Sequence, residues 1–259
     1  MQVAGKRVLL TGATGGLGEA TANELATRGA SLVLSGRNRE ALEALVASLP
    51  GEGHSALLAD LAEPGAATWL VEQALAGGPV DVCIANAGLP GGGSMANLTP
   101  EAISDVIRVN LEVPVMMAQA VVPSMVERGS GQIIFIASVA GKFSLPGSTL
   151  YSGTKAGLRT VSWSLRGELK SNGVGVTAIT PGFIREAGMF VKRGGVTPWF
   201  VRTRTPAQFG KAVVRAIERN PGEIVLAPLT LRAIANLAVA MPGVLVGLLG
   251  RSPAARRGN

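Results

Sequence analysis

The chain has few of the side chains that enzymes most often use as nucleophiles or metal ligands. Its 259 residues include one cysteine, Cys83, one histidine, His54, and one tyrosine, Tyr151. A single cysteine excludes an internal disulfide and fits a reducing compartment. A single histidine, in the loop-like segment GEGHS, argues against a histidine-rich zinc site or a Ser–His–Asp triad. We therefore expect no metal site.

The N-terminal segment MQVAGKRVLL lacks the long apolar run and the small-residue cleavage site of a signal peptide, so we expect a cytoplasmic protein. Acidic residues are scarce only toward the C-terminus. Residues 1–184 hold 12 Lys and Arg and 14 Asp and Glu, a net charge of −2, whereas residues 185–259 hold 12 and 3, a net charge of +9. This asymmetry predicts either solvated arginines on helix surfaces or an anionic partner, either phosphate or a membrane. We expect no nucleic-acid partner, because no recognition motif accompanies the charge.

Glycine and apolar residues are abundant, with 35 glycines and 47% hydrophobic residues. Short apolar segments alternate with helical patterns, and we interpret seven of them as strands, at 7–11, 31–35, 56–60, 80–88, 131–138, 173–182 and 222–228. Apolar strands joined by crossover helices imply a parallel sheet that is covered on both faces. The sequence predicts an α/β, single-domain, Rossmann-type doubly wound fold with a seven-stranded parallel sheet. Residues 1–228 would form its catalytic part, and residues 229–259 an apolar helical extension with a basic tail.

The segment TGATGGLG, residues 11–18, follows the first predicted strand and opens a helix. Gly12 permits a sharp turn from strand to helix, and Gly16 lets the backbone approach a pyrophosphate at the helix N-terminus. Gly18 lets the helix pack close to the strand. No Gly-Lys-Ser/Thr follows, so the segment is not a P-loop. The turn predicts a bound dinucleotide.

The end of the second predicted strand indicates which dinucleotide is bound. An acidic residue there would accept the ribose 2′-hydroxyl of NAD. The chain instead has LSGRNRE, with Arg37 and no acidic residue before Glu40. An arginine suits a 2′-phosphate through charge-assisted hydrogen bonds. The sequence thus favours NADP(H) over NAD(H); in the other interpretation, Arg37 is exposed and only caps the following helix.

The order of further motifs resembles the short-chain dehydrogenase/reductase superfamily, in its compact one-domain branch. The resemblance covers residues 6 to about 228, and Ser138 lies 13 residues before Tyr151, which is the usual spacing of that family. The matching motifs are the glycine turn 11–18, Asp60–Leu61, ANAG at 85–88, Val109–Asn110, Ser138, YSGTK at 151–155 and Pro181–Gly182.

The resemblance implies roles for four catalytic residues. Tyr151 would be the general acid in carbonyl reduction and the base in the reverse direction. Lys155, one helical turn further on, would lower the pKa of Tyr151 and hold the nicotinamide ribose. Ser138 would donate a hydrogen bond to the substrate oxygen, and Asn110 would hold a water that relays the proton.

The resemblance also implies a set of cofactor-binding residues. Asp60 and Leu61 would line the adenine pocket, and residues 86–88 would support the central strand beside the cofactor. The full set is Thr11, Gly12, Thr14, Gly16, Leu17, Gly18, Arg37, Asp60, Leu61, Asn86, Ala87, Gly88, Tyr151, Lys155, Pro181, Gly182 and Ile184.

Two positions depart from the family pattern. Ala85 stands where an asparagine is common, which is a mild variation. Glu186 stands five residues after Pro181, where a threonine commonly bonds the nicotinamide carboxamide. A carboxylate cannot donate that bond unless it is protonated. Backbone groups near Ile184 are the alternative partner, and the role of Glu186 stays open.

We therefore expect an NADP(H)-dependent oxidoreductase that interconverts a carbonyl and an alcohol. A lid is predicted at 183–205. Its apolar residues favour an apolar or lipid-like substrate, although packing or a subunit interface would explain them equally. These residues are Phe183, Ile184, Met189, Phe190, Val191, Trp199 and Phe200. One alternative is an NADPH-binding scaffold at a membrane without turnover. Another, an epimerase or dehydratase of the longer related branch, is disfavoured by chain length and glycine spacing.

The segment AIANLAVAMPGVLVGLLG, residues 233–250, carries no charge and lies between Arg232 and Arg251. Its length is near the lower limit for a membrane span, and Pro242-Gly243 divides it, which argues against a simple span. The segment could cap its own domain, or pack against a second copy in a homodimer or homotetramer. A third interpretation is a contact of residues 229–259 with an anionic membrane surface, which would place the protein peripherally at the inner face of a membrane.

Overall fold

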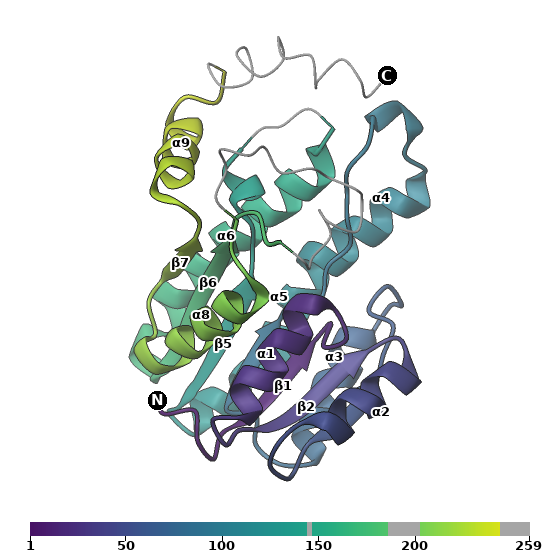
Figure 1. The fold of residues 1–259 in the computed structure, drawn as a ribbon, viewed down its shortest axis with the longest axis vertical. Helices are drawn as coiled ribbons and strands as arrows, with labels where there is room; N and C mark the ends of the chain where they lie inside the picture. The colour runs from purple at the N-terminus through teal and green to yellow at the C-terminus, as the bar shows by residue number, and fades with distance from the viewer. Residues whose placement is uncertain (144–146, 186–202, 244–259) are drawn as a thin grey trace.

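The computed structural model describes residues 1–143, 147–185 and 203–243 and contains a single parallel sheet (Figure 1). The strand order is β3-β2-β1-β4-β5-β6-β7, and every neighbouring pair is parallel. The strands are β1 (Arg7–Thr11), β2 (Ser31–Gly36), β3 (Ser55–Leu58), β4 (Val82–Ala85), β5 (Gly131–Ile136), β6 (Val174–Pro181) and β7 (Glu223–Leu226). The predicted seven-stranded parallel sheet is confirmed.

Helices connect the strands. The main ones are α1 (Gly16–Ala26), α2 (Arg39–Ser48), α3 (Ala66–Ala76), α4 (Pro100–Ile107), α5 (Val113–Glu127), α6 (Thr149–Leu169), α8 (Pro206–Arg219) and α9 (Leu229–Ala240). Short helical turns are η1 (Met95–Asn97), the π-helical η2 (Arg108–Glu112), η3 (Val139–Lys142) and η4 (Lys170–Asn172). The N-terminus of α8 is fixed by a capping box, in which the side chains of Thr205 and Gln208 each accept a hydrogen bond from the other's backbone N–H.

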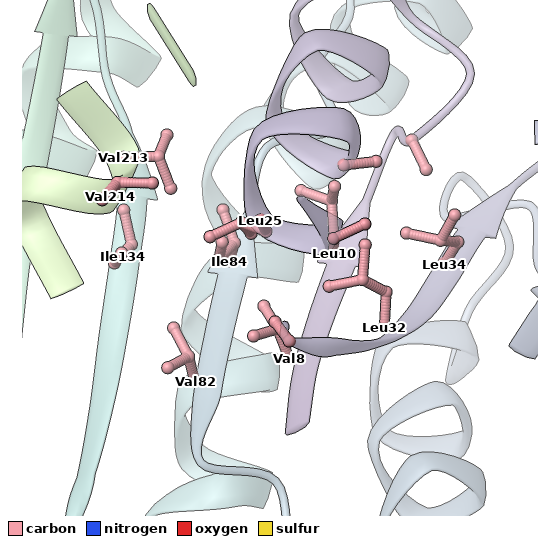
Figure 2. Close-up of a cluster of buried hydrophobic side chains, with 14 of the residues drawn as sticks. Val8, Leu10, Leu25, Leu32, Leu34, Val82, Ile84, Ile134, Val213 and Val214 are labelled. Atoms are coloured by element: carbon pink, nitrogen blue, oxygen red, sulfur yellow. The ribbon is translucent and has the colours of Figure 1, made fainter. Parts of the chain in front are cut away.

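Alternate side chains of the strands enter two separate cores, one on each face of the sheet. Val8 and Leu10 of β1 pack with Leu25 of α1 in one core, which α2 and α8 also cover (Figure 2). Leu9 points the other way into the second core, which α3, α5 and α6 cover. Because successive strand side chains point to opposite faces, helices on both faces are needed to bury the sheet. This arrangement confirms the doubly wound fold.

Several strands end earlier than the apolar pattern predicted. β4 ends at Ala85 and β5 at Ile136, so residues 86–88 and Ser138 lie in the connections that follow these strands. β3 covers 55–58, and Asp60 lies beyond it. Single backbone hydrogen bonds continue past two of these ends, from the N–H of Ala59 to the carbonyl of Gly36 and from the N–H of Ala137 to the carbonyl of Ile179. An apolar run alone does not reveal where strand pairing stops.

The helical run Pro100–Glu127 is long and apolar enough to cross a membrane by length and composition. In the fold, however, its α5 half buries Met117, Val121 and Met125 in the second core. We therefore interpret it as a core helix of the domain. A buried core helix can be as long and as apolar as a helix that crosses a membrane.

The long connection after β6 is held at its base by a bridge between Ile184 and Arg204. The backbone N–H of Arg185 donates to the carbonyl of Arg204 at 2.9 Å, and the N–H of Arg204 donates to the carbonyl of Phe183 at 2.9 Å. The rest of the predicted lid, with Glu186, Met189, Phe190, Val191, Trp199 and Phe200, lies outside the described residues, as does the segment 244–259. The predictions made for those residues stay predictions.

Candidate active site

The predicted site residues gather at the carboxyl edge of the sheet. Thr11 ends β1, Asn86 follows β4, Ser138 follows β5 and Gly182 follows β6. The strands are parallel, so all these ends lie on the same edge. The strand order changes direction between β1 and β4, and in open α/β sheets such a switch point is where ligands bind.

The glycine turn brings three backbone segments closer together than side chains would allow. Gly12 has a φ of +63°, and a Cβ atom there would lie 2.9 Å from the Cα atom of Ala87. A Cβ atom on Gly18 would lie 2.1 Å from the carbonyl oxygen of Gly12. Gly15 precedes α1 and provides no side-chain cap, so the N–H groups of the first helical turn are left for another acceptor. Such a turn fits a pyrophosphate.

Thr11 and Asn86 join the glycine turn to the connection after β4. The hydroxyl of Thr11 accepts hydrogen bonds from the backbone N–H groups of Asn86 and Ala87, both at 3.1 Å. The amide of Asn86 donates to the carbonyl oxygens of Thr11 at 2.9 Å and Gly12 at 3.2 Å. The sequence predicted these residues as cofactor-binding, but the structure shows that they also bind each other.

The region beyond β2 is open at the place predicted for the adenosine. Gly36 lies beside Thr14, whose hydroxyl oxygen would be 3.3 Å from a Cβ atom on Gly36. Arg37 is exposed, and its guanidinium is 3.9 Å from the carboxylate of Asp60. Asp60 also accepts a hydrogen bond from the N–H of Ala62 at 3.0 Å. The structure thus brings Thr14, Arg37 and Asp60 together.

The two arginines near this region differ in their contacts. Asn38, not Arg37, caps α2, because its side chain accepts from the N–H of Ala41 at 2.9 Å. The interpretation of Arg37 as a helix cap is therefore wrong. Arg39 is paired along α2 with Glu43 at 3.4 Å. Arg37 is the arginine placed at the strand end.

The other predicted cofactor residues lie along the same edge. Gly16 and Leu17 form the first turn of α1, and Leu61 is buried beyond β3. Gly182 follows β6, and its N–H donates to the carbonyl of Leu226 at 3.1 Å. Three further predicted residues also lie at this edge, but none of their contacts indicates a role in cofactor binding: Gly88, Pro181 and Ile184.

Tyr151, Lys155 and Ser138 meet where α6 passes the end of β5. Ser138 precedes η3, and its hydroxyl accepts from the N–H of Ala140 at 3.2 Å. Tyr151 and Lys155 are one turn apart on α6, and the Lys155 Nζ atom lies 5.9 Å from the centre of the Tyr151 ring. Lys155 is buried, and its Nζ donates to the carbonyl of Ile136 at 2.8 Å.

Asn110 links this cluster to the connection after β4. It is fully buried in η2; its side-chain oxygen accepts from the N–H of Leu89 at 2.7 Å, and its amide donates to the carbonyl of Leu89 at 2.9 Å. The amide also lies 3.4 Å from the hydroxyl of Thr154, the neighbour of Lys155. Thr154 lies within the YSGTK motif, but the sequence predicted no role for it. The water-relay role of Asn110 stays a prediction.

Burial dominates the protonation of the cluster. It raises the pKa of Tyr151 above the ordinary value, and the hydrogen bond with the Ser138 side chain acts in the opposite direction. Burial also lowers the pKa of Lys155 to about 8. The sequence predicted that Lys155 would lower the pKa of Tyr151. In this structure the hydrogen bond with Ser138 acts in that direction, and the ammonium of Lys155 donates to the carbonyl of Ile136; the effect of Lys155 on Tyr151 stays a prediction.

Acidic, cysteine and histidine side chains do not cluster at this edge. Within residues 1–143, 147–185 and 203–243, the structure contains no group of three or more such residues that could hold a metal ion.

A doubly wound sheet with a glycine-rich turn at its switch point defines a dinucleotide-binding fold of the Rossmann type. A family model described as short chain dehydrogenase matches residues 6–194. Ketoacyl reductase HetN of Nostoc sp. (strain PCC 7120) is 35% identical over 86% of this chain and 78% of its own length. Dehydrogenase/reductase SDR family member 7B of Bos taurus is 33% identical over 96% of this chain and 80% of its own. The chain belongs to the short-chain dehydrogenase/reductase family, whose members are oxidoreductases acting on carbonyl and alcohol groups.

Solved structures agree with this assignment. A short-chain dehydrogenase from Sphingobium yanoikuyae in complex with NADPH has a TM-score of 0.77 and 30% identity, covering 95% of this chain and 96% of that one. A 3-oxoacyl (acyl-carrier-protein) reductase from Agrobacterium tumefaciens with NADP bound has a TM-score of 0.77 and 27% identity, covering 87% and 94%. The similarity to both extends over nearly their whole length.

The lowered pKa of Lys155 predicts a pH-dependent cost to stability. The folded protein has a pKa of about 8 there against an ordinary value of 10.5, so the cost is complete below pH 8 and disappears as the pH rises to 10.5. The Lys155→Met variant does not carry this cost. Its unfolding free energy minus that of wild type should therefore be about 2–3 kcal/mol larger at pH 7 than at pH 10. Urea unfolding at the two pH values measures this. Lys211→Met, at an exposed lysine of α8, is the control. A gap between Lys155→Met and wild type that does not change with pH would contradict the burial argument.

Proposed function

We propose that the protein is an NADP(H)-dependent oxidoreductase that interconverts a carbonyl and an alcohol, with Tyr151 as the general acid and base. The observation that carries the proposal is the cluster of Ser138, Tyr151 and Lys155 at the carboxyl edge of the sheet, on the same edge as the glycine turn. NADPH, when bound, supplies the hydride for the carbonyl carbon. The residues of this chain orient the carbonyl and provide the proton.

In reduction, Tyr151 donates its phenolic proton to the carbonyl oxygen as that oxygen gains charge, and in oxidation it takes the proton back. Ser138 donates a hydrogen bond to the same oxygen. Lys155 lies close enough to favour the phenolate through its charge. Burial favours the phenol form of Tyr151, which is the form that donates a proton in reduction. Asn110 supports a proton path through water beside Thr154.

The cofactor would lie across the switch point between β1 and β4. The helix N-terminus at residues 16–18 would hold the pyrophosphate, and Arg37 the 2′-phosphate, at the open end of β2. Asp60 and Leu61 would border the adenine, and residues 86–88 and 181–184 the nicotinamide end. The NADP and NADPH in the similar solved structures support this choice.

An apolar or lipid-like ketone is the substrate class that we propose. Its support is the name of one relative, a ketoacyl reductase, and of one similar structure, a 3-oxoacyl (acyl-carrier-protein) reductase. Chain-length dependence tests it: in a series of 3-ketoacyl thioesters and methyl ketones, kcat/KM should rise with the length of the alkyl chain.

Tyr151→Phe should lower turnover by a factor of at least about 10²–10⁴, because it removes the proton donor and keeps the ring. NADPH should still bind, with a Kd close to that of wild type by fluorescence titration. Activity of the variant near that of wild type would contradict the mechanism. If wild-type protein binds NADPH but oxidises it with none of the ketones, the protein is a scaffold without turnover.

Arg37→Gln should weaken NADPH binding about tenfold and leave NADH binding unchanged, because an exposed arginine–phosphate contact is lost and NADH lacks that phosphate. The ratio of the two Kd values measures the effect. Arg39→Gln is the matched control, since Arg39 is an exposed arginine within α2 and does not lie at the end of β2. An unchanged cofactor preference in the Arg37 variant would remove Arg37 from the site.

Helix α9 is apolar on the side that faces away from the domain. It contacts η3 and buries Ala235 and Ala238, whereas its large apolar side chains are exposed: Leu229, Ile234, Leu237, Val239 and the following Met241. A helix that only capped its domain would turn its large side chains inward. Exposure of this kind marks an interaction surface.

We propose that this face of α9 contacts an anionic membrane surface, so that the protein is peripheral at the inner face of a membrane. Arg232 is exposed on the same helix, and residues 185–259 carry a net charge of +9. Anionic headgroups complement that charge. A second copy in a homodimer or homotetramer is the competing occupant, and it would bring two such charges together, which costs free energy.

The double variant Leu237→Ser/Val239→Ser should bind phosphatidylglycerol vesicles at least about tenfold more weakly than wild type, because two apolar side chains are removed from the contact. Co-sedimentation measures binding, with neutral phosphatidylcholine vesicles in parallel. Trp69→Ser on α3, which is also exposed, should bind as wild type does. If wild type ignores both vesicles and the double variant dissociates an oligomer, α9 is a subunit interface instead.

A further inference from the structure

A buried group of charges lies beside the candidate active site, and none of the motifs includes it. Glu223, the first residue of β7, has a side chain that is 11% exposed. Arg159 donates to its two carboxylate oxygens at 3.0 and 3.1 Å, and the hydroxyl of Thr180 donates at 2.8 Å. The Nζ atom of Lys142 lies 3.2 Å from the same carboxylate, and its side chain is 5% exposed.

The cluster joins the elements that carry the catalytic candidates. Lys142 ends η3, the short turn that begins immediately after Ser138. Arg159 lies on α6, one turn after Lys155. A Cβ atom on Gly141 would lie 2.7 Å from the backbone of α6, so the turn and the helix are in close contact at this point. Glu223 therefore binds both the turn that holds Ser138 and the helix that holds Tyr151.

Two cations and one carboxylate give this cluster a net positive charge; Lys142 and Glu223 are largely buried, whereas the side chain of Arg159 is 29% exposed. Burial acts to raise the pKa of Glu223, but the hydrogen bonds from Arg159 and Thr180 and the charges of Lys142 and Arg159 together lower it below its ordinary value. Glu223 is then ionised at neutral pH. Removing such charges from water is costly, and apolar residues often stabilise a fold equally well. Stability alone is a weak reason for the cluster, and its position suggests a different one.

We propose that Glu223 is a positioning residue, which holds the Ser138 turn against α6 through Lys142 and Arg159. The inference rests on the proposed function, in which Ser138 and Tyr151 act on one oxygen atom. Both groups must reach that atom within hydrogen-bond distance, and a shift of 1 Å can cost about 10²-fold in rate. η3 is a single short turn, so its far end needs a separate anchor, and Lys142 provides one.

Two variants test this anchor because they break the same contact with opposite changes of charge. Lys142→Met removes one positive charge and leaves Arg159 paired with Glu223. Glu223→Gln removes one negative charge and leaves the two cations facing each other. If the cluster acts by positioning, both variants should lower kcat by about 10- to 100-fold. The Kd for NADPH should stay within about twofold of wild type, because the glycine turn is formed by β1 and α1.

The pH profile of alcohol oxidation separates positioning from long-range electrostatics. Displacing Ser138 weakens the hydrogen bond that lowers the pKa of Tyr151, so the low-pH limb, on which activity rises as Tyr151 loses its proton, should move to higher pH in both variants. A purely electrostatic effect would move the limb to higher pH in Lys142→Met and to lower pH in Glu223→Gln. Opposite shifts would therefore overturn the proposal, as would an unchanged kcat in both variants.

Asp81→Asn is the control for a general loss of stability. Asp81 is a partly buried carboxylate that bonds the N–H of Arg7 at 3.0 Å, at the opposite end of β1 from the site. It should leave kcat and the pH profile unchanged, with all variants assayed well below their unfolding temperatures. Should Glu223→Gln fail to fold, Lys142→Met alone decides through kcat and NADPH affinity. Tyr151→Phe is measured in parallel: if it retains activity, the proposed function fails, and if only the two cluster variants behave as wild type, positioning fails.

Discussion

Parallel pairing of β1 with β4 is the constraint on which the rest of the structure depends. The strand order runs in opposite directions from these two strands. Their pairing therefore places the connection after β1 and the connection after β4 side by side at the switch point. The glycines of the first connection then let its backbone lie against the second, and Thr11 and Asn86 bond the two together. A side chain at Gly12 or Gly18 would separate these segments, so the site exists only because the backbone itself forms it.

Helix α6 adds the second half of the site. Its regular spacing places Tyr151 and Lys155 on one face, while its packing buries Lys155 almost completely. Burial acts on the two groups in the same sense, since each is pushed toward its neutral form. The hydrogen bonds from Ser138 and to Ile136 oppose that effect. The pKa values of Tyr151 and Lys155 thus depend on how deeply α6 is packed.

Two described elements near the C-terminus, β7 and α9, both contact η3, the turn that follows Ser138. β7 contributes Glu223 to the buried cluster under η3, and α9 packs on η3 from outside. The same helix exposes Leu237 and Val239. A partner that covers α9 would therefore contact a helix that packs directly on η3, the turn that follows Ser138.

The sequence by itself determined the sheet, the order of its elements and the site residues that belong to motifs. Alternating apolar segments and the glycine turn are local patterns, and the spacing of Tyr151 and Lys155 on a helix needs no knowledge of the rest of the chain. Only the tertiary structure decided where the strands stop, that Asn38 and not Arg37 caps α2, and that burial and Ser138 act in opposite directions on the pKa of Tyr151. It also revealed the contacts of Thr154, for which the sequence predicted no role within its motif, and of Glu223, which belongs to no motif. Their contacts join residues far apart along the chain, and such contacts depend on packing, which a local pattern does not encode.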